Sequence, residues 1–342
     1  MIFYRNHILD KNSIKIKDKD GKYKFTITDK NNKDVIDKDV LEYINRLIIP
    51  PAYNDVSIFY VKKPKILFEG YDDKGRKQQI YSTDHKKKAS RKKFCHLVSF
   101  GKLLPKILSD IKNNIKEKAL TKEKIISIIL KIVMKCGFRL GNLKYQKLYN
   151  SFGISNIMVK HIKFKKIKVN ELGLVECMNI KFIGKKGVVN ECDITNGELI
   201  TEIKKLIIGK KNTDYVFKYL KSETNKLEVI KCIDINTWLK KYDKNITSKL
   251  FRTFDTNILF IELMQKKEDP VKLSVNQRKK NIIEVMKLIS SQINNTPAIA
   301  KKEYLHSDLW SIYLEHPKKF KKLFHDNNAM SCFLNFLHTY CL

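Results

Sequence analysis

The chain has 342 residues, of which 69 are Lys or Arg and 36 are Asp or Glu, so its formal charge at pH 7 is +33. Hydrophobic residues make up 43% of the sequence, which excludes a disordered polycation and allows a sizeable core. The charge favours anionic partners, although part of the lysine excess could reflect an AT-rich genome.

Short strands dominate the predicted structure of the first 90 residues. Alternating apolar runs at 14–17 and 23–28 are separated by Asp, Asn and Gly. Helical spacing at 40–49 ends at Pro50 and Pro51. Further strands are predicted at 56–61, 65–68 and 76–81, with a turn at 72–75 before the last of them. We therefore predict a β-rich N-terminal domain over 1–89.

The basic segment 85–93 contains few apolar residues, and we predict that it is an interdomain linker lying on a polyanion. Beyond it, apolar residues recur at helical spacing over 94–115 and 122–136. A hairpin is predicted at 174–183 and 188–194, with a tight turn at 184–187. Helical patterns return after 196, including 258–265, 271–293 and the apolar tail 329–342. These patterns predict a second, mainly helical domain over 90–342, and leave open whether the tail packs on it or on another chain.

Several kinds of site are missing from the sequence. It contains no G-x-x-x-x-G-K-[S/T], G-x-G-x-x-G or H-E-x-x-H motif, so no nucleotide or metal cofactor is expected. The seven cysteines are odd in number and lack a Cys-x-x-Cys pair, which predicts reduced thiols in a cytosol-like compartment rather than disulfides or a zinc site. No apolar run approaches the length of a membrane helix, and no signal peptide is visible.

The remaining candidates for chemistry are cations close to element boundaries. Arg139 follows the end of a predicted helix, Lys185 lies at the hairpin tip and Arg252 lies near the start of another helix. Thr296 and the proline after it predict the start of a short helix that ends at Tyr304. Among 69 basic residues any one is more often solvated or tracking phosphate, so no single position is specific.

Six segments in order make a specific pattern: IIPPAYNDV at 48–56, GYDDKGRKQ at 70–78, RLGNLKY at 139–145, IKFIGK at 180–185, KLFRT at 249–253 and NTPAIAKKEY at 295–304. Together they resemble the small type IB DNA topoisomerases of poxviruses, giant viruses and some bacteria. The resemblance implies an α+β fold, with a β-rich N-terminal domain and a larger, mainly helical catalytic domain containing a small antiparallel sheet. It also implies a monomer that clamps double-stranded DNA.

The implied activity is relaxation of supercoiled DNA through a transient 3′-phosphotyrosyl strand break, strand swivel and religation, without ATP or metal. If the chain is viral, the resemblance places it in the virion and at the viral replication site in the host cytoplasm; otherwise it implies the cytoplasm or nucleoid. Exchange of one phosphodiester for another conserves bond energy, which is why no energy source is needed.

The resemblance implies a role for each matching residue. Tyr304 would be the nucleophile, Arg139 and Arg252 would bind the non-bridging phosphate oxygens, Lys185 would protonate the departing 5′-hydroxyl, and Asn295 would donate a stabilising hydrogen bond. Guanidiniums suit equatorial phosphate oxygens because they are planar and always charged, and an alkoxide needs a proton as it leaves. Residues implied to bind DNA are Lys74, Arg76, Gln78, Tyr81, Tyr145 and Lys249.

Two departures and two alternatives bear on these expectations. Gln79 stands where poxviral members have an aromatic residue, so a strict poxvirus-type pentanucleotide preference is not expected; Phe254 replaces a Tyr, which we interpret as a packing change. A tyrosine site-specific recombinase shares the chemistry but usually has His three residues before the second arginine, where this chain has Lys249. A non-enzymatic DNA-packaging protein would leave the six segments unexplained.

Overall fold

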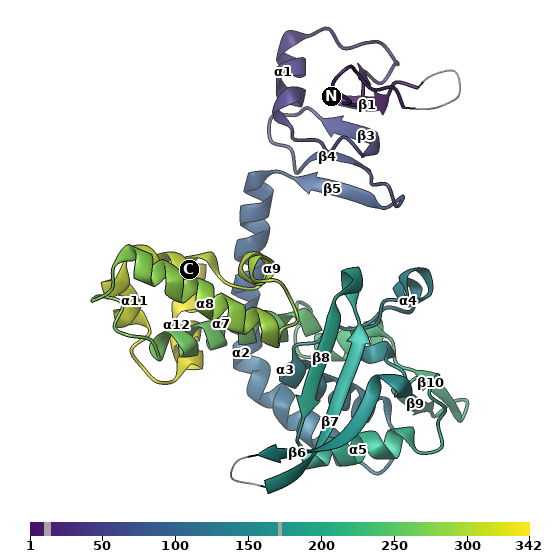
Figure 1. The fold of residues 1–342 in the computed structure, drawn as a ribbon, viewed down its shortest axis with the longest axis vertical. Coiled ribbons are helices and arrows are strands. Elements are labelled where there is room, and N and C mark those ends of the chain that lie inside the picture. Colours follow the sequence, from purple (N-terminus) through teal and green to yellow (C-terminus); the bar gives the residue numbers. More distant parts are fainter. Residues whose placement is uncertain (10–14, 170–172) are drawn as a thin grey trace. The chain divides into compact units, whose positions relative to one another are not determined.

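The computed structural model describes residues 1–9, 15–169 and 173–342. The chain forms two compact units, Met1–Lys93 and Phe94–Leu342. Strands form most of the regular structure of the first unit and helices most of the second, so the α+β class predicted from the sequence is confirmed (Figure 1).

The N-terminal unit contains a five-stranded antiparallel sheet of order β2-β1-β3-β4-β5. Its elements are β1 (Ile2–His7), β2 (Phe25–Thr28), α1 (Lys38–Arg46), β3 (Asn54–Phe59), β4 (Ile66–Tyr71) and β5 (Lys77–Tyr81). Residues of α1, β1, β3 and β4 form a small apolar core, centred on Val56 and Ile58. The strand predicted at 14–17 begins outside the described residues, and Lys15 and Lys17 make isolated bridges.

The segment predicted as a linker at 85–93 is helical instead. Helix α2 runs without interruption from Thr83 to Ile115, whereas apolar spacing predicts a start at Phe94. The first turns of α2 present no apolar stripe. Residues 83–93 are accordingly exposed or half-buried. Their lysines still have good helix propensity. Periodicity alone misses a helix of this kind, because that signal depends on a face packing against a core.

A three-stranded antiparallel sheet of order β6-β7-β8 lies in the second unit (Figure 1). Its strands are β6 (Ile162–Val169), β7 (Gly173–Ile183) and β8 (Val189–Ile194). Strands β7 and β8 form the predicted hairpin, and the short 3₁₀ helix η3 (Lys185–Gly187) lies at its tip. A smaller two-stranded sheet consists of β9 (Lys218–Lys221) and β10 (Lys226–Val229).

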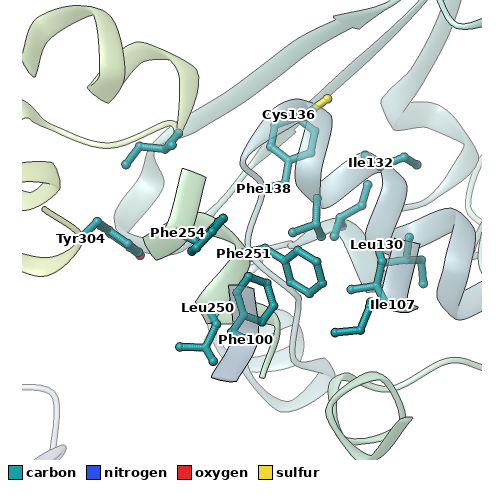
Figure 2. Close-up of a cluster of buried hydrophobic side chains, with 14 of the residues drawn as sticks. Phe100, Ile107, Leu130, Ile132, Cys136, Phe138, Leu250, Phe251, Phe254 and Tyr304 are labelled. Carbon is teal, nitrogen blue, oxygen red and sulfur yellow. The ribbon is translucent and has the colours of Figure 1, made fainter. Parts of the chain in front are cut away.

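Helix α3 (Lys122–Cys136) lies in the middle of the second unit, and its residues 124–130 are all buried. A helix that is buried all round belongs in a core. The other helices are α4 (Leu143–Tyr149), η1 (Ile154–Asn156), η2 (Val159–His161), α5 (Gly197–Ile207), α6 (Cys232–Lys240), α7 (Ser248–Gln265), α8 (Val275–Gln292), α9 (Pro297–Glu303), α10 (Ser307–Glu315), α11 (Pro317–Leu323) and α12 (Ala329–Cys341). Helix α7 packs against α3, α8 and α12, and Figure 2 shows the aromatic core that results.

The tail packs on its own unit. Phe333 and Leu337 of α12 are fully buried, and Phe333 contacts Phe254 of α7 at a ring-centroid distance of 5.8 Å. Phe254 also meets Phe100 of α2 at 5.4 Å. An apolar ring at position 254 therefore fills a space between three helices.

The expectation of reduced thiols is wrong for four cysteines. Disulfides join Cys95 to Cys341 and Cys136 to Cys192, whereas Cys177, Cys232 and Cys332 are free. The paired residues are 246 and 56 positions apart in sequence, so no local spacing reveals them. Tertiary packing alone brings their sulfurs together.

Candidate active site

Tyr304 lies at the end of a short, well-capped helix. The Thr296 side chain caps α9, Pro297 occupies its first turn, and the Tyr304 backbone N–H donates to the carbonyl of Ala300 at 3.1 Å. This confirms the helix predicted from 296 to 304. Only 5% of the tyrosine is exposed, and its ring lies at the edge of the aromatic core (Figure 2).

Asn257 of α7 fixes the backbone around Tyr304, a contact that sequence reasoning missed. Its amide nitrogen donates to the Tyr304 carbonyl at 2.9 Å, and its amide oxygen accepts from the His306 N–H at 2.8 Å. Asn257 is fully buried, so these bonds form away from water. The only sequence signal is an amide five residues after Arg252, directly before the helical pattern predicted at 258–265.

Arg252 lies beside Tyr304 in the second turn of α7. Its guanidinium carbon is 4.9 Å from the centroid of the Tyr304 ring, and one terminal nitrogen donates to the Ile293 carbonyl at 2.6 Å. The side chain is only 4% exposed, and its Nε has no hydrogen-bond partner among the described residues. Burial is the main cause that lowers its pKa from the ordinary value for arginine to about 10; Tyr304 opposes the decrease and Arg139 adds to it. The site therefore contains a buried guanidinium whose Nε–H donates to no described group.

Arg139 reaches the same turn from another direction. It follows the end of α3, and its guanidinium donates to the Asn295 side-chain oxygen. The Asn295 amide nitrogen in turn donates to the carbonyl of Ile293 at 3.2 Å. The two arginines therefore converge on the 293–295 turn between α8 and α9.

Close backbone contact lets the end of α3 approach that turn. Gly137 caps α3 in the left-handed region at φ 61°. A Cβ at this position would lie 2.8 Å from both the Gln292 carbonyl oxygen and the Ile293 Cα. Only glycine satisfies the conformation and the contact together. Arg139 is thereby held two residues from a point of backbone contact.

Lys185 stands apart from this cluster. It lies exposed in η3 at the tip of the β7–β8 hairpin. The structure records no hydrogen bond or ion pair between its ammonium and another described residue. Of the five predicted catalytic residues, Tyr304, Arg252, Arg139 and Asn295 are therefore connected through side chains and the 293–295 turn, and Lys185 is not.

Two of the predicted DNA contacts belong to the second unit. The Lys249 ammonium lies 5.7 Å from the centroid of the Tyr304 ring, one turn before Arg252 on α7. Tyr145 on α4 is 55% exposed and stacks on Tyr149 at a centroid distance of 6.0 Å. Both side chains are accessible.

Of the other four predicted DNA contacts, Lys74, Arg76 and Gln78 lie in or beside the β4–β5 turn of the first unit, and Tyr81 lies at the far end of β5, paired with Ile66. The Asp72 carboxylate accepts from Arg76 Nε at 2.8 Å and from Gln78 Nε2 at 3.0 Å, and the Arg76 guanidinium holds the pKa of this carboxyl well below its usual range. Lys74 lies in the turn with its N–H on Asp72, and the Tyr81 hydroxyl donates to Gln79 at 2.8 Å. The Asp72 carboxylate thus holds the side chains of Arg76 and Gln78 in fixed positions.

None of the described helices is long and apolar enough to cross a membrane. The chain matches the family of the eukaryotic DNA topoisomerase I catalytic core over residues 82–329. It is 31% identical over 296 residues to DNA topoisomerase 1B of Acanthamoeba polyphaga mimivirus, covering 85% of this chain and 84% of that protein.

A second viral relative is DNA topoisomerase 1B of vaccinia virus (strain Copenhagen), 25% identical over 84% of this chain and 86% of its own length. DNA topoisomerase 1 of Mycosarcoma maydis is 23% identical over 64% of this chain, which spans only 22% of that longer protein. The chain therefore belongs to the topoisomerase I family, as a small type IB DNA topoisomerase of the poxvirus and giant-virus type.

Proposed function

We propose that this chain relaxes supercoiled duplex DNA by cutting one strand through a 3′-phosphotyrosyl bond to Tyr304, letting the ends swivel and resealing them, without ATP or metal. The observation that carries the proposal is Arg252, a buried guanidinium 4.9 Å from the Tyr304 ring with an unpaired Nε. A buried unpaired donor is costly unless a ligand uses it. A phosphate oxygen is the ligand that suits a guanidinium.

In the proposed reaction, the Tyr304 hydroxyl gives its proton to water as its oxygen attacks the phosphorus, and the bond from phosphorus to the 5′-oxygen breaks. Negative charge on the non-bridging oxygens is stabilised by the positive charges of Arg252, which is buried, and Arg139, which is half-buried. Asn295 orients Arg139 through their hydrogen bond and adds a neutral donor. Lys185, exposed at the hairpin tip, delivers the proton to the 5′-oxygen.

The same proposal assigns binding roles to the other cations. Lys249 and Tyr145 would contact the strand near the scissile phosphate, and Lys74, Arg76, Gln78 and Tyr81 would hold the duplex from the N-terminal unit. A monomer that clamps DNA in this way uses both units of one chain. Its affinity for DNA would derive mainly from phosphate neutralisation.

Tyr304→Phe tests the nucleophile. The substitution removes one oxygen and keeps the ring that packs at the edge of the core. We expect no covalent DNA adduct and no relaxation of plasmid in EDTA, with salt-sensitive DNA binding retained. Relaxation at the wild-type rate by this variant would overturn the proposal.

Lys185→Ala tests the proton donor. Cleavage of ordinary DNA should slow by about 10²- to 10⁴-fold, the range for loss of a general acid. A substrate with sulfur at the 5′-bridging position should be cleaved at nearly the wild-type rate, because a thiolate leaves without a proton. Equal slowing on both substrates would contradict the role assigned to Lys185.

A further inference from the structure

A disulfide joins the hairpin that carries Lys185 to the end of α3 that leads to Arg139, and the rings of Phe182 and Phe138 pack beside it at a centroid distance of 4.9 Å. Cys136 is the last residue of α3, three positions before Arg139, and Cys192 lies in β8 of the hairpin that carries Lys185. Figure 2 shows Cys136 next to Phe138, at the end of α3 that leads to Arg139. Cys136 is buried and Cys192 is half-buried.

Hydrogen bonds also connect the end of α3 and strand β8 to the 293–295 turn. The Asn294 amide nitrogen donates to the Cys136 carbonyl at 3.1 Å, and its oxygen accepts from the Glu191 N–H at 3.4 Å. Asn294 thus contacts the residue at the end of α3 and the residue before Cys192. The disulfide closes a junction of α3, β8 and the 293–295 turn.

The hairpin extends from this junction to Lys185. Cys192 pairs with Ile180, and three further residue pairs separate that position from the tip, ending with Ile183 and Val189. Beyond them only η3 remains. Lys185 makes no recorded hydrogen bond or ion pair with another described residue, so the reach of its ammonium depends on how the hairpin is held. The disulfide is one anchor; the Phe152 N–H, which donates to the Ile183 carbonyl at 2.9 Å, and the contact of Phe182 with Phe138 are others.

We propose that the Cys136–Cys192 disulfide is a positioning device: it holds the base of the β7–β8 hairpin against the Arg139 turn, so that Lys185 reaches the leaving oxygen of the phosphate bound by Arg139 and Arg252. This inference rests on the proposed function. Opening the disulfide leaves phosphate binding intact and displaces the proton donor. The chain is therefore sensitive to thiol reductants at the proton-transfer step.

Reduction is a balanced two-electron step. A dithiol such as dithiothreitol breaks the Cys136–Cys192 bond, two thiols form with two protons, and the dithiol becomes a cyclic disulfide. Cys192→Ser opens the same bond without a reductant, at the half-buried end. The matched control is Cys341→Ser, which opens the Cys95–Cys341 disulfide between α2 and α12, at neither Arg139 nor the hairpin.

The experiment compares single-turnover cleavage of DNA with oxygen or sulfur at the 5′-bridging position, by the full-length chain. In Cys192→Ser we expect cleavage of the oxygen substrate to slow by about ten- to a hundredfold, the cost of a small displacement of a catalytic group. Cleavage of the sulfur substrate and affinity for DNA should stay within about twofold of wild type, which also shows that the variant is folded. Wild type in dithiothreitol should behave like Cys192→Ser, and Cys341→Ser like oxidised wild type.

Equal slowing on both substrates, or no slowing on either, would overturn the inference. The inference would also be overturned if Cys341→Ser changed the ratio between the cleavage rates of the two substrates as much as Cys192→Ser does. These results are distinguishable from failure of the proposed function, because they require covalent adducts at Tyr304. If the wild-type chain forms no adduct with either substrate, the proposed function and the inference fall together.

Discussion

Asn257 shows how one buried amide can organise a site. Its three hydrogen bonds connect α7, which carries Arg252, to the carbonyl of Tyr304 and the amide of His306. The phenol and the guanidinium that lies 4.9 Å from it are therefore fixed to the same helix. We infer that Asn257 positions Tyr304, the proposed nucleophile, without touching DNA.

Asn257→Ala should slow covalent adduct formation by about tenfold or more and lower the free energy of unfolding by about 1–3 kcal/mol, since it leaves buried backbone groups unpaired. The measurements are single-turnover cleavage and urea denaturation. A matched control is Asn281→Ala, which removes a hydrogen bond to the Tyr313 hydroxyl on α10, away from Tyr304. If both variants cleave DNA equally fast, Asn257 has no positioning role.

At the scale of elements, the short helix α9 depends on its ends. It has seven residues, too few to be stable alone, and only Ala300 is buried within it. The Ile299 N–H donates to the Thr296 hydroxyl, and this cap and the proline after Thr296 define the start of the helix. Tyr304 lies at its end. Fraying at the cap would loosen the segment that leads to the nucleophile.

Thr296→Ala should therefore reduce the free energy of unfolding by about 1 kcal/mol and slow cleavage, whereas Thr296→Ser should preserve both, because serine supplies the same capping oxygen. Thermal denaturation and cleavage kinetics measure the two effects. Equal slowing in the alanine and serine variants would show that the Thr296 methyl group, rather than the cap, matters.

At the scale of the whole molecule, the +33 charge predicts a strong dependence of DNA binding on salt. The logarithm of affinity should fall with the logarithm of salt concentration, with a slope of about −0.9 for each phosphate contact. Lys249→Ala should make this slope less steep by about 0.9, the contribution of one phosphate contact. Lys267→Ala is the control, because its ammonium is paired with Glu284 at 2.8 Å. An unchanged slope in Lys249→Ala would mean that Lys249 contacts no phosphate.

Local sequence was sufficient for several parts of the structure. Thr296 and Pro297 mark the start of α9, Gly137 marks the end of α3, and the residues around Gly184 and Gly187 define the hairpin tip. These features depend on residues within one or two turns of each other, so propensity and capping rules apply. The order of the six segments and the residues in them likewise indicated the family, which the match to the topoisomerase I catalytic core and the similarity to the mimivirus enzyme confirmed.

Only the tertiary structure placed Arg252 against Tyr304, joined Arg139 to Asn295 and paired cysteines up to 246 positions apart. It also showed that the basic residues before Phe94 continue a helix. Such contacts depend on how α3, α7, α8 and β8 pack, and packing is a property of surfaces formed by distant segments. The sequence by itself determined the charge, the ends of capped elements such as α9, and the family of this chain. The packed core decided that the Arg252 guanidinium is buried beside the Tyr304 ring.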